Sequence, residues 1–147
     1  MIFTNARIIF PDAIREDLAV TVRAGKIVEI GPSVAGANGA VDLHGNFLAP
    51  GFIDLHVHGG NGHDAMEAKA EAFHAICDYH ASGGTTSLLL TTATAPFHDI
   101  LLALTQIGNL RGRIPEIAGA HVEGPFIIAG IAPGRRTSSS FAKRTRN

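Results

Sequence analysis

Strand-type and helix-type segments alternate through the last two thirds of the chain, and this order constrains the fold more than any other feature. The order strand, helix, strand, helix, strand is that of consecutive βα units, whose strands lie parallel in one sheet. The sequence therefore predicts an α/β fold with a parallel sheet or barrel. The strand-type segments are residues 52–58, 86–91 and 117–122, and the helix-type segments are residues 65–81 and 97–110.

The first 49 residues have a different pattern, with short β-type segments separated by turn residues. Two β-type segments, residues 18–22 and 26–30, flank Ala24 and Gly25, and this arrangement predicts a β-hairpin. We expect a separate β-rich unit over residues 1–49, with too few strands to close a sandwich alone. Its expected strands are residues 6–10, 18–22, 26–30 and 41–43.

Composition and length exclude several classes of protein. A chain of 147 residues with 46% hydrophobic residues is long enough for one domain with a core. It contains no apolar stretch of the roughly 18 residues that span a bilayer, and no signal-peptide pattern at its start. Cys77 is the single cysteine, so no internal disulfide forms. We therefore expect a cytoplasmic protein without a membrane partner.

Charge is distributed unevenly along the sequence. Residues 129–147 contain five Lys/Arg and no acidic residue, whereas residues 1–128 contain seven Lys/Arg and 13 Asp/Glu. The basic segment is rich in Ser, and we expect it to be a disordered or out-of-frame tail. We expect no nucleic-acid partner, because neither interleaved aromatic residues nor a recognised nucleic-acid-binding fold accompanies these charges.

Two pairs of potential metal ligands lie at the ends of the first and third strand-type segments. His56 and His58 are two residues apart, and so are His121 and Glu123. Residues two apart lie on the same face of a strand. Imidazole and carboxylate groups are common ligands of catalytic metal ions. The pattern predicts a hydrolytic metal site, although core or loop residues with ordinary hydrogen-bond partners would fit the same spacing.

The first strand-type segment also predicts two different faces. Asp54 shares the face of the histidines, and its carboxylate either orients His56 as a hydrogen-bond acceptor or caps the floor of a barrel. Ile53, Leu55 and Val57 form the other face, which we expect to pack beneath helices.

The loop after this segment offers candidate substrate contacts. Gly59 and Gly60 are turn residues or positions where the backbone approaches a substrate, and His63 lies in the same loop. His121 either supports the metal site or makes a hydrogen bond inside the sheet.

Three short motifs resemble a known family. The sequence PGFIDLHVHG at residues 50–59 resembles the first barrel strand of the amidohydrolase superfamily. HVEGPF at residues 121–126 resembles the third-strand signature of the N-acetylglucosamine-6-phosphate deacetylases, and GTTS at residues 84–87 also fits that family. The resemblance implies a (β/α)8 TIM-type barrel, with its first three βα units at residues 50–128, preceded by part of a small β-sandwich at residues 1–49.

The resemblance also implies an activity and a cofactor. It implies a metal-dependent amide hydrolase that converts N-acetylglucosamine 6-phosphate to glucosamine 6-phosphate and acetate. Glu123 matches the glutamate that binds the catalytic metal, and His56 and His58 match histidines that bind a second metal in some members. The expected cofactor is one or two divalent ions, Zn or Fe first, with Mn or Co as alternatives. The expected partner is a phosphorylated amino sugar, and full-length members are commonly homo-oligomers.

The chain departs from the family in length. A (β/α)8 barrel takes about 250 residues, and the family's two further metal-binding histidines and catalytic aspartate are expected beyond residue 147. Because the family-like sequence stops near Ile127, we hypothesise a truncated or frame-shifted product that is inactive alone. Two alternatives remain: another amidohydrolase such as a dihydroorotase, against which the motif at residues 121–126 argues, or a non-catalytic metal-binding fragment.

Overall fold

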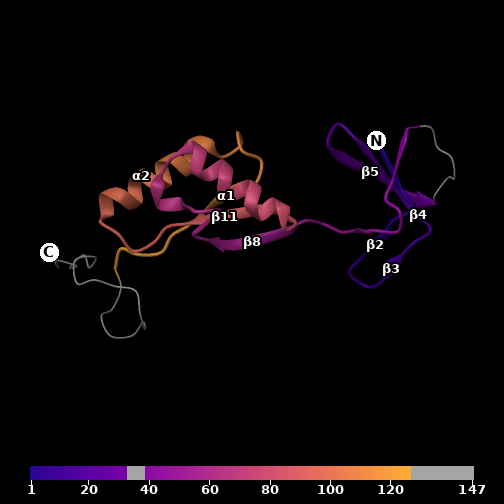
Figure 1. Ribbon diagram of the computed structural model, residues 1–147, viewed down its shortest axis with the longest axis horizontal. Helices are drawn as coiled ribbons and strands as arrows, with labels where there is room; N and C mark the ends of the chain where they lie inside the picture. The colour runs from indigo at the N-terminus through magenta and orange to yellow at the C-terminus, as the bar shows by residue number, and fades with distance from the viewer. Residues whose placement is uncertain (33–38, 127–147) are drawn as a thin grey trace. The chain divides into compact units, whose positions relative to one another are not determined.

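The computed structural model describes residues 1–32 and 39–126. The chain divides into two compact units, Met1–Pro50 and Gly51–Asn147, and each contains its own sheets (Figure 1). The basic tail expected at residues 129–147 lies outside the described residues. Within the described ranges, no helix combines the length and apolar character needed to cross a membrane.

Short strands build the first unit. The predicted hairpin is confirmed: β4 and β5 pair antiparallel around Ala24 and Gly25, which both have positive φ, as a tight hairpin turn requires. Two sheets form, with strand orders β5-β4-β1-β6 and β3-β2-β7. The sequence does not predict β1, β3 or β7. The strands are β1 (Ile2–Thr4), β2 (Arg7–Ile9), β3 (Ile14–Arg15), β4 (Leu18–Arg23), β5 (Lys26–Pro32), β6 (Ala40–Asp42) and β7 (Phe47–Leu48).

The second unit has the predicted alternation of strands and helices. Its main sheet is parallel, with the strand order β12-β11-β8, and a short hairpin, β9 with β10, follows β8. This is a mixed α/β architecture. The elements are β8 (Phe52–Val57), β9 (Gly59–Gly60), β10 (His63–Asp64), the 3₁₀ turn η1 (Ala65–Glu67), α1 (Ala70–Ser82), β11 (Thr85–Thr91), α2 (Phe97–Leu110) and β12 (Ile117–His121).

The first helix begins later than the sequence predicts. Instead of a continuous helix over residues 65–81, a 3₁₀ turn comes first, and Ala68 then adopts left-handed backbone angles with φ 52°. A capping box explains the interruption: the Glu67 carboxylate accepts a hydrogen bond of 3.0 Å from the backbone N–H of Asp64. The chain therefore leaves the turn before α1 starts at Ala70.

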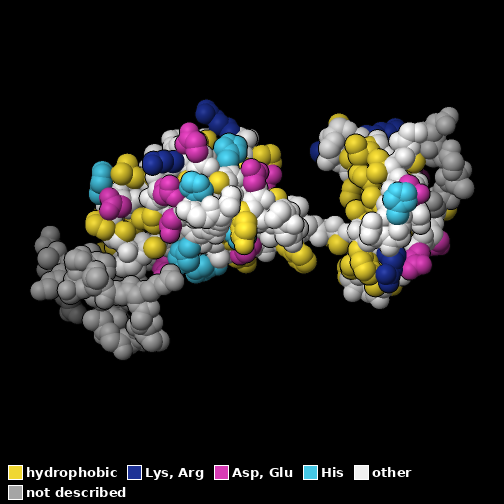
Figure 2. Space-filling view, in the orientation of Figure 1, with side chains coloured by type: hydrophobic (Ala, Val, Ile, Leu, Met, Phe, Trp, Pro, Cys, Tyr) yellow, Lys and Arg dark blue, Asp and Glu magenta, His cyan; other side chains and the backbone are white. Residues whose placement is uncertain are grey.

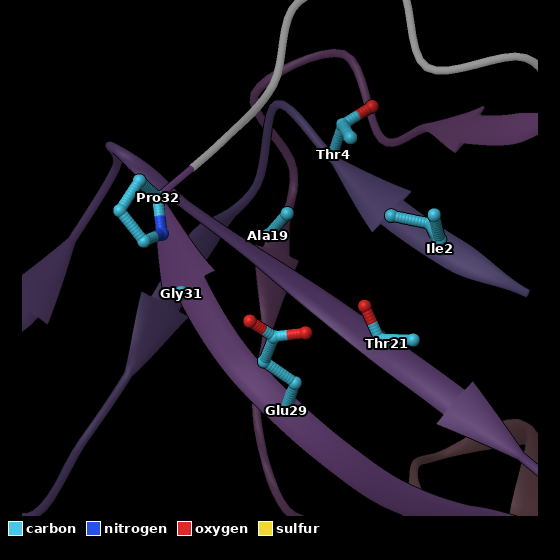
Figure 3. Close-up of a pocket in the computed structure, with 7 residues that line it drawn as sticks. All are labelled: Ile2, Thr4, Ala19, Thr21, Glu29, Gly31 and Pro32. Carbon is cyan, nitrogen blue, oxygen red and sulfur yellow. The ribbon is translucent and has the colours of Figure 1, made fainter.

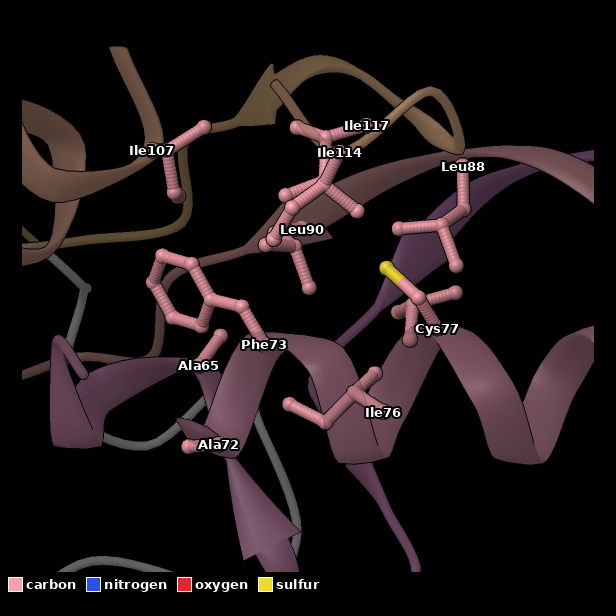
Figure 4. Close-up of a cluster of buried hydrophobic side chains, with 11 residues drawn as sticks. Ala65, Ala72, Phe73, Ile76, Cys77, Leu88, Leu90, Ile107, Ile114 and Ile117 are labelled. Atoms are coloured by element: carbon pink, nitrogen blue, oxygen red, sulfur yellow. The ribbon is translucent and has the colours of Figure 1, made fainter. Parts of the chain in front are cut away.

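Apolar side chains from both helices pack against the central strand. Figure 1 shows α1 and α2 on one side of β8 and β11, and Figure 4 shows Phe73 and Ile76 of α1 beside Leu90 of β11. Ile107 brings α2 into the same cluster. Burial of this kind is the main favourable term in folding, so this cluster holds the strands in place.

One predicted face of β8 is wrong in part. Val57 is 3% exposed, but Ile53 and Leu55 are 69% and 62% exposed and do not pack beneath helices. β8 is an edge strand of the sheet, and the helices pack over its neighbour β11. The pairing of β8 with β11 also shifts register before Val57, which interrupts the alternation of faces that the sequence pattern assumed.

Candidate metal centre

Three potential metal ligands lie together at the carboxyl ends of two parallel strands. His56 and His58 come from the end of β8, and Glu123 follows β12, with β11 between these strands. One ligand atom from each residue lies within 4.8 Å of the other two. Parallel strands place their carboxyl ends at one edge of a sheet, which brings together residues 65 positions apart in sequence.

The distances between these atoms fit one cation. The Nε2 atoms of His56 and His58 are 3.0 Å apart, and Glu123 Oε2 lies 3.6 Å from the first and 3.2 Å from the second. Ligands at about 2.0–2.1 Å around a tetrahedral zinc ion are separated by about 3.4 Å. The observed spacings scatter around this value.

The chemistry of the atoms fits a cation as well. A neutral imidazole carries one N–H, so when His56 Nε2 donates to His58 Nε2, the latter has no proton to share with Glu123. If His58 Nε2 is the donor instead, His56 Nε2 has no proton to share with Glu123. A divalent cation between the three atoms would accept a lone pair from each. Their side chains are half-exposed, at 50%, 41% and 35% respectively, so the site is open to solute.

His121 lies beside this group. Its ring centroid is 4.7 Å from that of His56, with the two planes tilted by 41°. It is exposed at the end of β12. The structure thus brings His121 to the edge of the site through a ring contact.

Asp54 contacts His56 through the backbone, whereas the sequence-based expectation concerned the His56 ring. Its Oδ1 accepts a hydrogen bond of 3.0 Å from the backbone N–H of His56. The reason is the shift of register in β8, which leaves that N–H outside the regular strand pairing. Asp54 therefore holds the backbone of the histidine.

Packing explains the two loop glycines. A Cβ atom at Gly59 would overlap the carbonyl oxygen of His63, and one at Gly60 would lie 2.9 Å from the Tyr79 ring. The Gly59 carbonyl is also 3.1 Å from Nε2 of His80, within hydrogen-bond distance. Both glycines are needed for the close approach of β9 to β10 and α1, whether or not a substrate binds there.

His63 contacts an acidic partner and is not part of the three-residue group. Its Nδ1 lies 3.2 Å from Glu67 Oε1. The pKa of the Glu67 carboxyl is lowered, mainly because the Asp64 N–H donates to it, and to a smaller extent by His63. His63 is 40% exposed, so one part of its ring remains accessible.

Two residues near the site are missed by sequence reasoning. Thr91 belongs to a run that reads as a buried apolar strand, and Thr92 follows it directly. Both are 0% exposed and hydrogen-bonded to the segments that carry the candidate metal ligands. The available signal is the pair of polar residues at the end of an apolar strand, since buried hydroxyls need partners.

Two hollows lie in the first unit, not at the candidate metal centre. One, of about 300 Å³, is lined by β1, β4 and β5, and Glu29 is its one charged lining residue (Figure 3). The other is an apolar groove of about 320 Å³. Figure 2 shows hydrophobic side chains gathered on the visible face of this unit. Neither hollow is lined by a group of His, Cys, Asp and Glu residues such as a catalytic metal needs.

Comparison with known proteins shows which proteins this chain is similar to. No family model matches the chain. The N-acetylglucosamine-6-phosphate deacetylase of Lysinibacillus sphaericus is 36% identical over 141 residues, which cover 90% of this chain and 36% of the relative. The corresponding deacetylase of Vibrio furnissii is 33% identical over 129 residues, covering 84% and 32%. This chain is related to the N-acetylglucosamine-6-phosphate deacetylases.

Structural comparison leads to the same deacetylases. The crystal structure of N-acetylglucosamine-6-phosphate deacetylase from Pasteurella multocida matches with a TM-score of 0.84 and 26% identity, covering 98% of this chain and 39% of that one. The family resemblance predicted from the motifs is confirmed. The chain spans about a third of the length of the curated deacetylases it matches.

Proposed function

We propose that this chain carries the metal-binding part of a deacetylase that hydrolyses N-acetylglucosamine 6-phosphate to acetate and glucosamine 6-phosphate. The observation that carries the proposal is the convergence of His56, His58 and Glu123 from two parallel strands. The names of the curated relatives support the substrate. The motif at residues 121–126, which includes one of these ligands, favours this activity over that of a dihydroorotase.

The fold proposal follows from the parallel sheet. The order β12-β11-β8, with helices connecting consecutive strands, is what the first three βα units of a (β/α)8 barrel would form. We assign these units to residues 50–128 and part of a small β-sandwich to residues 1–49. A basic segment at residues 129–147 completes the proposed organisation.

In this proposal, His56, His58 and Glu123 hold one or two divalent ions, Zn or Fe first and Mn or Co as alternatives. Such an ion supplies Lewis acidity toward the amide carbonyl and lowers the pKa of water. The strands position the three side chains, and their partial exposure leaves room for the N-acetyl group. His63 is a candidate sugar contact, because its ring is accessible and Glu67 holds it in place.

Metal titration tests the site directly. The purified chain, freed of metal with EDTA, is titrated with Zn²⁺ by calorimetry. We expect one high-affinity class of sites in the unsubstituted chain and at least a tenfold weaker dissociation constant in His58→Ala and Glu123→Ala. His44→Ala is the matched control, because His44 is exposed in the other unit. Equal affinities in all four proteins would refute the proposed ligands.

A product assay tests the reaction. The metal-loaded chain is incubated with N-acetylglucosamine 6-phosphate, and released acetate and glucosamine 6-phosphate are quantified beside a parallel reaction with dihydroorotate. Metal-dependent acetate release supports the proposed reaction, and ring opening of dihydroorotate supports the alternative amidohydrolase. Metal binding with turnover of neither substrate would make the 147-residue chain a non-catalytic metal-binding protein.

A further inference from the structure

Two adjacent threonines lie between the two halves of the ligand set. Thr91 is the last residue of β11, the central strand of the sheet, and Thr92 follows it. We propose that Thr91 and Thr92 are positioning residues for the candidate metal centre, one hydroxyl for each half of the ligand set. The inference rests on the metal site of the proposed function.

Thr91 fixes the backbone between the two histidines. The N–H of Val57 donates a hydrogen bond of 2.9 Å to Thr91 Oγ1, and this hydroxyl lies 3.2 Å from the Leu89 carbonyl oxygen, to which it donates. Val57 separates His56 from His58, and its side chain is buried on the helix side of the sheet. Holding this one residue sets the direction of the imidazole on either side.

The shift of register explains why a side chain must perform this task. Before Val57, the pairing advances three residues along β8 and two along β11. Backbone N–H groups in such a bulge lose their regular partners. The N–H of His56 is satisfied by the Asp54 carboxylate and that of Val57 by the Thr91 hydroxyl. Both replacements occur in the segment that carries the imidazoles.

Thr92 fixes the other half of the ligand set. The N–H of Glu123 donates to Thr92 Oγ1 at 3.0 Å, and the same hydroxyl donates to the Glu123 carbonyl at 3.1 Å. The Thr92 N–H bonds to the His121 carbonyl at 3.0 Å, where β12 ends. A single hydroxyl therefore holds both backbone groups of Glu123 beyond the end of the strand, a task that requires a group able to donate and accept.

A third threonine provides a matched control. Thr94 lies two residues beyond Thr92, and its Oγ1 is buried without a hydrogen-bond partner in the described part of the chain. Thr94 packs against Gly124, the residue after Glu123, so replacing it with valine keeps this packing and removes a hydroxyl of the same kind from the same segment without breaking a hydrogen bond.

The experiment measures Co²⁺ binding by visible absorption in the complete 147-residue chain. Thr91→Val and Thr92→Val keep the side-chain shape and remove the hydroxyl. We expect each to weaken Co²⁺ affinity about tenfold or more, as losses of groups that orient metal ligands do, and to change the absorption envelope of the bound ion. Thr91→Ser and Thr92→Ser restore the hydroxyl and the spectrum, and Thr94→Val keeps both affinity and spectrum.

Amide hydrogen exchange of the unsubstituted chain gives a second measurement that needs no variant to fold. We expect the amides of Val57 and Glu123 to exchange slowly and to slow further when Zn²⁺ is added. Unchanged Co²⁺ affinity and spectrum in folded valine variants would overturn the inference while the metal site stood. If the valine variants do not fold, fast exchange of both amides that Zn²⁺ does not slow would also overturn the inference. Absence of metal binding by the unsubstituted chain would refute the proposed site, and the inference with it.

Discussion

The two units of the chain bury apolar side chains to very different extents. In the second unit, eleven buried residues form one cluster between the helices and the sheet. In the first unit, the buried cluster has three residues, Ala6, Ile8 and Val20. Large apolar side chains there, such as Ile27 and Phe47, are 63% and 55% exposed. Helices cover a face of one sheet, whereas the residues of the first unit that the structure describes form strands and no helix.

Buried and exposed side chains also have separate roles within the second unit. The helix-facing side of the sheet contains Leu88 and Leu90, which are fully buried, and the strand ends present half-exposed candidate metal ligands. A packed layer thus supports a polar edge. The comparison teaches that the candidate site depends on the core of its own unit, and the following measurements examine that dependence.

The largest effect should come from the core of the second unit. Phe73→Ala removes a side chain that is 0% exposed, and we expect the free energy of unfolding to fall by about 3–5 kcal/mol. Phe47→Ala makes the same change in the first unit, where the ring is half-exposed and stacks against Arg7 at 4.1 Å. We expect a loss of about 1 kcal/mol or less there. Urea unfolding compares the two, and equal losses would contradict the difference in burial.

Metal should stabilise one unit and not the other. With free Zn²⁺ at 100 times its dissociation constant, binding adds about 2.7 kcal/mol to the stability of the state that binds it. We expect amides of the second unit, including those in α1, to exchange more slowly after Zn²⁺ addition, and amides of β4 and β5 to stay unchanged. EDTA should reverse the effect. Equal protection of both units would indicate that the metal binds elsewhere.

Cys77 reports opening of the second unit through its thiol. Burial raises the pKa of Cys77 to about 11, so the reactive thiolate is scarce in the folded chain. Alkylation by iodoacetamide at pH 8 should be about two orders of magnitude slower in the folded than in the urea-unfolded chain. Because the folded pKa is raised, the thiol's contribution to stability is lost as pH rises above the unfolded value of about 8.5. Equal alkylation rates would show that the core around Cys77 opens readily.

The smallest effects should come from one exposed carboxylate in each unit. The pKa of Asp42 is lowered, mainly because the His44 N–H donates to it, and that of Glu67 is lowered by the Asp64 N–H. A lowered folded pKa gives stability that is present above the unfolded value of about 4 and is lost as pH falls through the folded value. Glu67→Gln should speed exchange of the Asp64 amide above pH 4 and leave the His44 amide unchanged. Asp42→Asn should do the reverse.

Much of the second unit can be predicted from local sequence. Pro96 and the apolar spacing after it set the bounds of α2, which match residues 97–110. The start of α1 is not predictable from apolar spacing, because the capping box at Asp64 and the left-handed Ala68 interrupt the pattern. Short strands such as β3 and β7 contain two residues each and give no periodic signal.

The candidate site likewise has a part that the sequence predicts and a part that it does not. The proximity of His58 to Glu123 follows from two-residue spacing and from the common edge of parallel strands. The hydroxyl contacts of Thr91 and Thr92 do not follow, because they join positions 34 and 31 residues apart. The exposure of Leu55 depends on strand order, which a single segment does not encode.

The extra residue in β8 also makes this strand sensitive to length. From Asp54 to Val57 the pairing advances three residues along β8 and two along β11. The opposite shift between Thr85 and Ser87 of β11 compensates for it, so a one-codon deletion between Asp54 and Val57 would destroy this match and send the earlier side chains of the strand to the opposite surface. Leu55, which is exposed, would then face the helical layer, and neighbouring side chains that face this layer would become exposed. In this segment, the number of amino acids is under tighter physical control than the identity of most of them.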